Sequence, residues 1–142
     1  MSGRRDPYSG FRFLVEAEAV IVGACARVKG LARETRVETY REGGVNDFEY
    51  KLASLTTYGN LILERGLLKE TLWNWHDQVV GGNIQRHKIT VTLRDESSTA
   101  AWIWYVDGAY PVKWSVTDLD ASSPNVLFES IEFAHHGIRR AA

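Results

Sequence analysis

The sequence predicts a mainly β protein, an antiparallel barrel or sandwich of about seven to eight strands with one flanking α-helix. Three observations lead to this fold class. Apolar residues alternate with polar ones in several short segments, glycines separate these segments, and only one segment has convincing helical periodicity. The chain has 142 residues, of which 44% are hydrophobic and 25% are charged. That composition supports one hydrophobic core, so we expect a single domain over residues 1–142.

The segments before the helix have the character of strands. Apolar residues alternate with charged ones from Phe11 to Ala17, which predicts a half-buried strand over residues 11–22 with a hairpin or bend at Gly23. Thr and Val alternate with charged residues further on, so residues 24–41 are expected to continue as a strand. Residues 45–58 are expected to be a long connection. A short strand over residues 60–65 then ends at Gly66.

The helix is predicted by apolar residues that recur four, three and four positions apart, namely Leu68, Leu72, Trp75 and Val79. This spacing places them on one face of a helix over about 69–80. Thr71, or a residue just before it, is the expected N-cap, and the following glycine pair stops the helix. We expect Leu72, Trp75 and Val79 to form the helix core, packed onto the sheet.

Residues 84–94 alternate more cleanly than any other segment. The apolar set, His87, Ile89, Val91 and Leu93, is expected to face the core. The polar set faces water and consists of Arg86, Lys88, Thr90 and Thr92. Two further strands over residues 99–106 and 110–116 are expected to flank a turn at Asp107–Gly108, and a last strand covers residues 126–136.

Chemistry-bearing motifs are not found in the sequence. Lys and Arg number 17 and Asp and Glu number 18, so the net charge of −1 excludes a nucleic-acid binder that works by bulk positive charge. Cys25 is the only cysteine and is expected to be a small apolar filler. His76 lies on the helix, whereas His135 and His136 point to opposite faces of a strand. We therefore expect no catalytic residue, no cofactor and no metal.

The five tryptophans allow two interpretations, a stacking surface for sugars or bases and a core between sheet and helix. Core packing is favoured by their positions on the helix and the late strands. The N-terminal basic residues are not followed by an apolar segment, and no run of ~20 apolar residues occurs. The protein is therefore expected to be made in the cytoplasm without a signal peptide and without membrane insertion.

An ordered set of segments resembles the tail tube proteins of contractile phage tails, and most closely the tube subunits of phage-tail-like contractile injection systems. These segments extend over nearly the whole chain and are Asp6–Tyr8, Phe11–Glu16, Tyr40–Gly44, Tyr50–Leu52, Leu55–Gly66, Leu72–His76, Pro111–Trp114, Asp118–Asp120 and Glu129–Gly137. Departures from the family pattern, such as Ala53 and Ser54 where relatives often have Pro-Gly, fall in loops and on the surface.

The resemblance implies a tail-tube fold whose subunits assemble into six-membered rings, stacked into a hollow tube inside a contractile sheath. Sheath, baseplate and terminator proteins of the same particle are the implied partners. Effector protein or DNA is the implied cargo of the lumen, without sequence-specific nucleic-acid binding. The protein would end in a phage tail or a phage-tail-like particle, and the sequence does not distinguish a phage, a bacteriocin-like particle and an injection system.

Two sets of residues are expected to serve the assembly. Residues 42–58 are too apolar and aromatic for a free solvated loop, which predicts burial against another subunit. The expected ring-stacking residues are Glu42, Gly43, Gly44, Phe48, Tyr50, Leu52, Leu55 and Tyr58. The polar set Arg86, Lys88, Thr90 and Thr92 is expected to line the lumen. The alternatives are a small β-barrel that binds an apolar or sugar ligand, and a tube protein of the type VI secretion kind; an enzyme on the same barrel is disfavoured.

Overall fold

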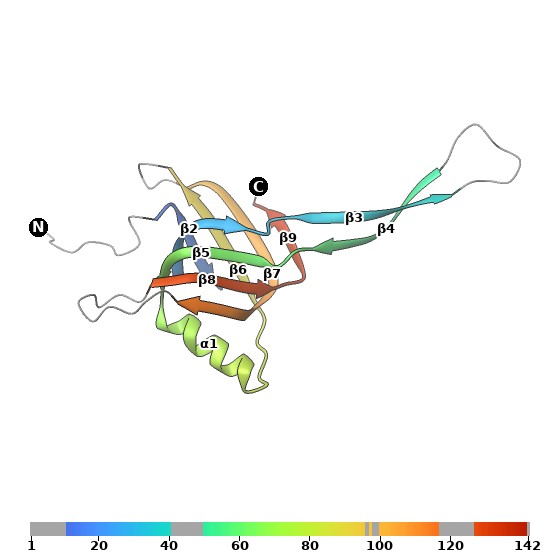
Figure 1. Ribbon diagram of the computed structural model, residues 1–142. Helices are drawn as coiled ribbons and strands as arrows, with labels where there is room; N and C mark the ends of the chain where they lie inside the picture. Colours follow the sequence, from blue (N-terminus) through green and yellow to red (C-terminus); the bar gives the residue numbers. More distant parts are fainter. Residues whose placement is uncertain (1–10, 41–49, 96, 98–99, 117–126, 142) are drawn as a thin grey trace, which may run out of the picture.

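The computed structural model describes residues 11–40, 50–95, 97, 100–116 and 127–141. Within this part of the chain there are nine strands and one helix (Figure 1). Their bounds, in chain order, are β1 Phe13–Ala17, β2 Val20–Lys29, β3 Arg33–Tyr40, β4 Tyr50–Tyr58, β5 Leu61–Leu68, α1 Glu70–Val80, β6 His87–Arg94, β7 Ala100–Val116, β8 Leu127–Ala134 and β9 Gly137–Arg140.

Six strands form a closed antiparallel barrel in the order β6-β1-β2-β5-β8-β7, which the pairing of β6 with β7 completes. The short strand β9 is an additional strand, paired with β7 beyond the end of β8. Side chains of alternating parity fill the barrel: Val15, Leu61, Ile89, Val91 and Phe133 are at most 1% exposed. The predicted fold class, a mainly β barrel with one helix, is thus confirmed.

Helix α1 is confirmed over nearly the predicted range and packs beside the barrel, in contact with β2 and β7 (Figure 1). Leu72 and Trp75 join the core cluster, because their spacing points both toward the barrel. Gly81 caps the end of the helix, where its N–H donates to the carbonyl of Asp77 at 3.1 Å. Of the expected N-cap positions, Thr71 or a residue just before it, Thr71 itself lies within the helix, and the N-cap is Lys69, which makes no side-chain hydrogen bond there.

The first hairpin turns earlier than predicted. Glu18 and Ala19 adopt positive φ of 49° and 67°, whereas Gly23 lies inside β2 opposite Val15. A tertiary contact stabilises this turn: the Glu18 carboxylate accepts a hydrogen bond of 2.8 Å from the backbone N–H of Lys88. The turn therefore depends on β6, which lies far away in the sequence, and local glycine patterning predicted it wrongly.

The expected strand over residues 24–41 is two strands in different sheets. Gly30 has a φ of +83° and follows the end of β2, after which β3 leaves the barrel and, among the described strands, pairs only with β4. In the expected long connection over residues 45–58, the described residues 50–58 form β4, which is one strand of a two-stranded ribbon. Gly66 lies within β5, where a Cβ atom would come within 1.9 Å of the Ala24 carbonyl oxygen.

The late strands also differ from the prediction. Residues 100–116 form one long strand, in which Asp107 and Gly108 are not a hairpin turn. The register of the β6–β7 pairing shifts between His87 and Ile89, opposite this point, and Gly108 has a φ of +61°. The last segment continues past Ala134 into β9, which was not predicted because four residues give too short a pattern.

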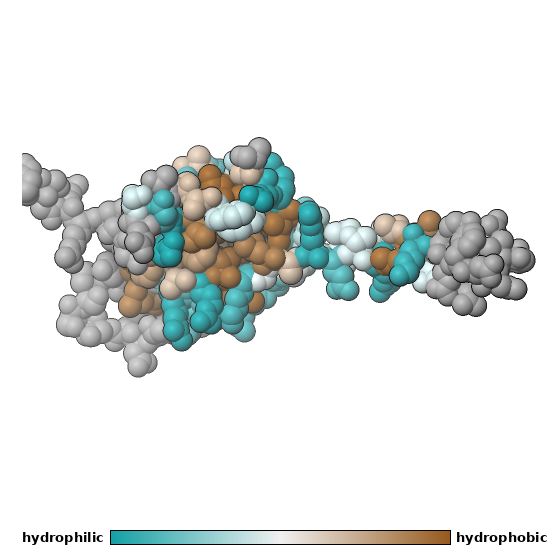
Figure 2. Space-filling model, turned by 90° about the horizontal axis from the view of Figure 1, so that it is seen from above, coloured by the Kyte–Doolittle hydropathy of each residue, from teal (hydrophilic) through white to brown (hydrophobic). Residues whose placement is uncertain are grey.

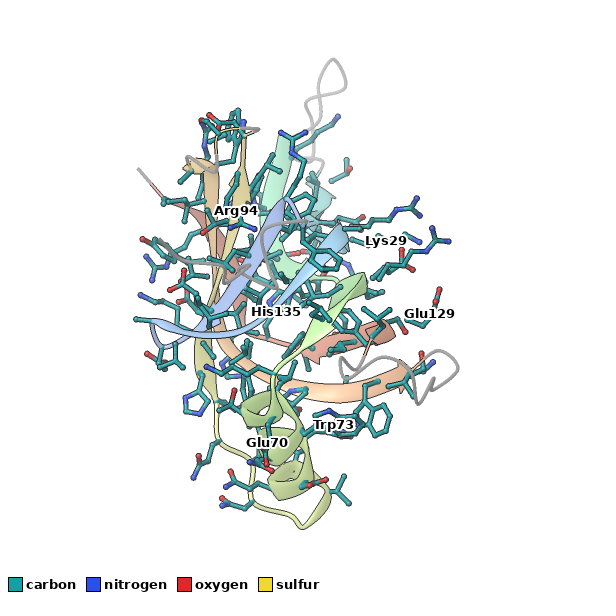
Figure 3. All side chains as sticks on the ribbon, turned by 90° about the vertical axis from the view of Figure 1, so that its left-hand side faces the viewer. Lys29, Glu70, Trp73, Arg94, Glu129 and His135 are labelled. Atoms are coloured by element: carbon teal, nitrogen blue, oxygen red, sulfur yellow. The ribbon has the colours of Figure 1, made fainter. Side chains whose placement is uncertain are left out.

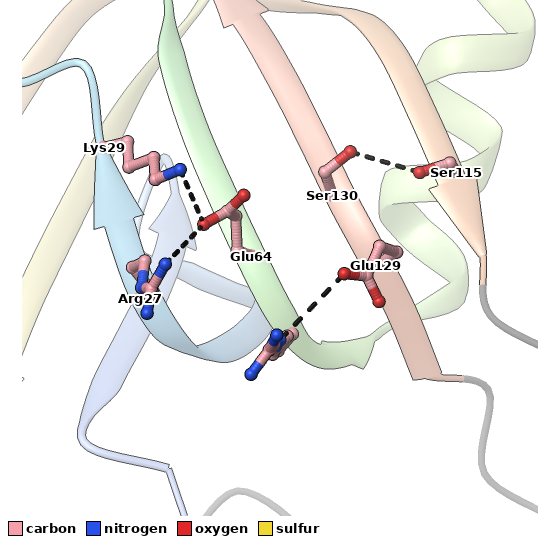
Figure 4. A network of polar contacts seen from close by, with 7 residues as sticks. Arg27, Lys29, Glu64, Ser115, Glu129 and Ser130 are labelled. Carbon is pink, nitrogen blue, oxygen red and sulfur yellow. Dashed lines mark hydrogen bonds and ion pairs between the residues drawn. The ribbon is translucent and has the colours of Figure 1, made fainter.

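Polar contacts link neighbouring strands on the outside of the barrel (Figure 4). Glu64 on β5 is within 3.6 Å of Arg27 and 3.3 Å of Lys29 on β2. The hydroxyls of Ser115 and Ser130 lie 3.1 Å apart between β7 and β8. Ion pairs at the surface contribute about 0–1 kcal/mol each, so the core carries most of the stability. In the described ranges, no helix is both long and apolar enough to cross a membrane.

Candidate functional site

A two-stranded ribbon projects from the barrel (Figure 1), and we call residues 33–40 and 50–58 the arm. Its strands pair in antiparallel register from Arg33 and Tyr58 at the base to Tyr40 and Tyr50 at the far end. The side chains of residues 33–39 and 51–57 are all exposed. An isolated two-stranded ribbon is at best marginally stable in water, so contacts beyond its own strand pairing are needed to hold the arm.

Apolar side chains on the arm are uncovered within the subunit. Val37, Leu52 and Leu55 are 54%, 56% and 60% exposed. Figure 2 shows apolar surface interspersed with polar side chains along the ribbon. Both edges of the ribbon also present backbone groups to the surroundings. Exposed apolar groups on a paired ribbon mark the arm as a contact surface for another protein chain.

The structure brings only part of the predicted ring-stacking set together. Leu52 and Leu55 lie on the exposed arm, and Tyr50 begins β4. Tyr58 lies at the base of the arm, half-buried, with its ring edge-on to His135 at 5.8 Å. The predicted residues Glu42, Gly43, Gly44 and Phe48 lie outside the described residues. Val37, exposed on the opposite strand, lies outside the predicted set, which begins at Glu42.

The polar residues predicted to line a lumen lie on or next to β6. Lys88 and Thr90 are half-buried on the outside of the barrel, whereas Ile89 and Val91 point into it. Thr92 differs from the prediction, because it is only 8% exposed and offers little surface. Arg86 precedes β6 and holds its guanidinium 4.6 Å from the centre of the Tyr110 ring.

Strands β7 and β9 complete this polar face with residues that the sequence did not single out. The Tyr105 ring lies between two cations, with Lys88 Nζ at 4.6 Å and the Arg139 guanidinium at 4.8 Å. Arg139 also donates to both carboxylate oxygens of Asp107, at 2.8 and 3.2 Å. These hydrogen bonds lower the pKa of Asp107, so the carboxylate remains charged and neutralises part of the face.

The helix residues pack as a core. Leu72 and Trp75 are 3% and 6% exposed, and Val79 is half-buried against the same cluster. The Trp75 indole N–H donates to the carbonyl of Gln85 at 2.8 Å, and its ring is edge-on to His87 at 4.9 Å. This burial supports a scaffolding role for the helix.

The remaining tryptophans divide between core and surface. Trp73 on α1 is edge-on to Trp114 at 4.1 Å, between the helix and β7 (Figure 3). The Trp114 indole N–H donates to His76 Nδ1 at 2.8 Å, so this histidine is a packing partner. Trp102 is 42% exposed and lies under the Arg140 guanidinium at 4.0 Å, so the expectation of a tryptophan core does not extend to it.

Groups that could perform chemistry are not gathered in one place within the part of the chain that the structure describes. Cys25 is fully buried, and burial raises the pKa of its thiol to about 12, so the reactive thiolate is absent at neutral pH. Among the described residues, no three His, Cys, Asp or Glu side chains are grouped to hold a metal ion. The arm and the polar face of β6, β7 and β9 are therefore the features that most need a partner.

Comparisons with known proteins agree with this arrangement. The family model described as T4-like virus tail tube protein gp19 matches residues 9–139. A chain in the cryo-EM structure of the anti-feeding prophage baseplate, 6-fold symmetrised, is 31% identical with a TM-score of 0.70, and the match covers 99% of this chain and 97% of that one. No curated protein matches the chain.

Two further solved structures share the fold at lower identity. A chain of the PVC sheath-tube complex in the extended state, from an extracellular contractile injection system, is 22% identical with a TM-score of 0.72, covering 93% of this chain and 89% of that one. Hcp1 from Flavobacterium johnsoniae is 16% identical with a TM-score of 0.52, covering 92% and 95%.

Proposed function

Because the chain belongs to the family of the T4-like virus tail tube protein gp19, it is a structural subunit of an inner tube, and we propose that its copies close into six-membered rings that stack head to tail around a lumen. The observation that carries this proposal is the arm, an exposed ribbon with Leu52 and Leu55 uncovered. The arm gives each subunit a protruding element whose complement must lie on another copy.

The arm is proposed to form the contact between successive rings. Residues 42–58, which include Glu42, Gly43, Gly44 and Phe48, would lie against the adjacent ring. Burying Leu52 and Leu55 there would stabilise the contact by roughly 1.5–3 kcal/mol for each fully buried leucine. Stacking through an element that leaves the barrel also keeps the outer surface of the barrel free for contacts within a ring.

The proposed lumen surface is the outer face of β6 with its neighbours on β7. Lys88, Thr90 and Tyr105 project there, on the side of the strands opposite the core. The face carries charges of both signs, and Asp107 balances Arg139. A polar surface of mixed sign lets cargo pass without tight binding, which suits effector protein or DNA.

This placement predicts size-selective labelling of a cysteine introduced at Thr90. In assembled tubes, Thr90→Cys is expected to react quickly with a small maleimide and slowly with a bulky one that enters only at the tube ends. Gln78→Cys, on the exposed side of α1, is the control and should react equally fast with both. The thiol of Cys25 is buried and is not expected to react with either maleimide. Equal, fast labelling of Thr90→Cys by both reagents would place it outside the lumen.

The particle supplies the other proposed partners. Similar chains belong to structures of a baseplate, a sheath-tube complex and a tube-terminating cap. We propose that this subunit likewise meets sheath, baseplate and terminator proteins within a phage tail or a phage-tail-like particle, as a single domain without catalytic activity. The barrel interior is filled by Leu63, Ile131 and Phe133, which disfavours the alternative of a ligand-binding barrel.

Negative-stain microscopy of the purified full chain tests the proposal. We expect rings and, at higher concentration, rods with a central channel, because the arms of one ring find their binding surface on the next. Monodisperse monomers at every concentration would contradict a tube subunit and would favour a small barrel that binds a ligand.

A further inference from the structure

The arm meets the barrel at a junction where backbone segments lie unusually close. At Gly30 the chain leaves β2, and a Cβ atom there would come within 1.8 Å of the Asn60 carbonyl oxygen. With a φ of +83° as well, only glycine fits this position without strain. The two strands of the arm therefore enter and leave the barrel side by side, and the backbone at this point has little freedom to separate.

His135 lies against the same junction from the other side. It follows β8, and its Nε2 atom is 2.7 Å from the carbonyl oxygen of Gly59, the first of the two residues between the arm and β5. Because a carbonyl oxygen only accepts hydrogen bonds, Nε2 must carry the proton and donate. The imidazole ring also packs edge-on to Tyr58 at 5.8 Å and 62°. One side chain thus holds both the backbone and the last aromatic ring of the arm.

The segment that carries His135 is itself fixed to the barrel. The backbone N–H of His136 donates to the carbonyl of Asp107 on β7 at 2.8 Å. β8, which precedes this segment in the chain, and β9, which follows it, both pair with β7. A second polar contact supports the junction, since the Asn60 side-chain amide donates to the Glu132 carboxylate on β8 at 2.8 Å. The base of the arm is therefore tied to a rigid part of the sheet.

Packing alone does not explain a histidine at this position. The other ring nitrogen, Nδ1, is buried and has no hydrogen-bond partner among the described residues. A buried polar atom without a partner is unfavourable, and an apolar ring of similar size would avoid it. What the imidazole adds over such a ring is the donor that reaches Gly59. The hydrogen bond to the arm is thus the feature that distinguishes His135 from a simple core side chain.

We propose that His135 is a positioning residue that sets the direction in which the arm leaves the barrel. The inference rests on the proposed function, in which the arm contacts the adjacent ring. A ribbon attached by two backbone segments swings as a lever, so a small rotation at Gly59 moves the far end of β3 and β4 by a much larger distance. Holding the base from β8 orients the arm before assembly, which lowers the entropy that stacking must remove.

Three substitutions separate the hydrogen bond from the packing. His135→Phe keeps a ring against Tyr58 and removes both the donor and the unpaired nitrogen. His135→Gln places an amide N–H near the position of Nε2 and is expected to restore the tie to Gly59. His135→Ala removes the donor without adding bulk and gives a second variant without the hydrogen bond. The matched control is His136→Gln, at the exposed neighbouring position.

The direction of the arm is measured in unassembled full-length subunits by electron–electron distance spectroscopy. Spin labels are attached to Lys51→Cys on the arm and Lys113→Cys on β7, both exposed, while Cys25 remains buried. The native residue, His135→Gln and His136→Gln are expected to give one narrow distance distribution. His135→Phe and His135→Ala are expected to raise the population of other arm directions by about fivefold, the ratio that a typical hydrogen bond sustains.

The same variants are then assembled, and tube lengths are measured by microscopy. We expect shorter tubes for His135→Phe, although its midpoint of denaturation is unchanged or higher because the unpaired nitrogen is gone. A narrow distance distribution in His135→Phe, or a broadened one in His136→Gln, would overturn the proposal. Tubes of normal length in a variant whose distance distribution is broadened would overturn it as well. Failure of the proposed function can be told apart from failure of this proposal. If the arm does not stack the rings, removing the arm leaves tube length normal, whereas the distance measurements still report whether His135 sets the direction of the arm.

Discussion

Replacing Leu52 and Leu55 together by serine is expected to abolish long tubes while leaving the subunit folded. Both side chains are more than half exposed, so the free energy of unfolding of the unassembled subunit should change by less than about 0.5 kcal/mol. The stacking contact, in contrast, loses roughly 1.5–3 kcal/mol for each leucine that it buries. This loss recurs in every subunit of a ring, so its effect on assembly is large. Tube length by microscopy and denaturation of the subunit are the two measurements.

Val80→Ser is the matched control for this pair. Val80 is a 74% exposed apolar residue at the end of α1, far from the arm in the fold. Its replacement removes similar apolar surface but should leave tube length normal. Deleting residues 44–50 is expected to act like the double substitution, with folded subunits and no long tubes. Tubes of normal length in the deletion variant would exclude the arm as the stacking element.

Trp75→Ala is expected to lower the free energy of unfolding by about 3–5 kcal/mol, the range for a buried aromatic residue replaced by alanine. The substitution removes an indole that is 6% exposed, the hydrogen bond to the Gln85 carbonyl and the contact with Phe133. Urea denaturation of the unassembled subunit, followed by circular dichroism, measures the effect. A second tryptophan provides the comparison.

Trp102→Ala removes an exposed ring that contacts Arg140 and Trp104 at the surface, so we expect a loss of about 1 kcal/mol or less. The difference between the two variants follows from burial, because both delete the same side chain. A loss below about 1 kcal/mol for Trp75→Ala would mean that the helix does not pack onto the barrel through this face.

The parts of the fold that could be predicted are those with long, regular patterns. Leu72, Trp75 and Val79 repeat at helical spacing and are followed by Gly81, so the helix was predicted almost to the residue. The alternation around Ile89 and Val91 likewise gave the correct parity of β6. In both segments one side faces the core, so the spacing of the apolar residues shows the type of element and the side that is buried.

The parts that escaped prediction depend on contacts between distant segments. The turn at Glu18 is held by the backbone of Lys88, and the end of β2 at Gly30 is imposed by the approach of Asn60. β4 has exposed side chains on both faces, so it lacks the alternation by which strands are recognised. The hydrogen bond between His135 and Gly59 joins residues 76 positions apart in the sequence, so no local pattern predicts it.

The contact between rings is tested most directly by cryo-electron microscopy of assembled tubes, at a resolution that traces the arm. We expect each arm to cross from its own ring to the next, with Val37, Leu52 and Leu55 buried against a subunit there. Arms that remain within their own ring, or that extend into solvent while the rings stack through their barrels, would contradict the proposed function of the arm.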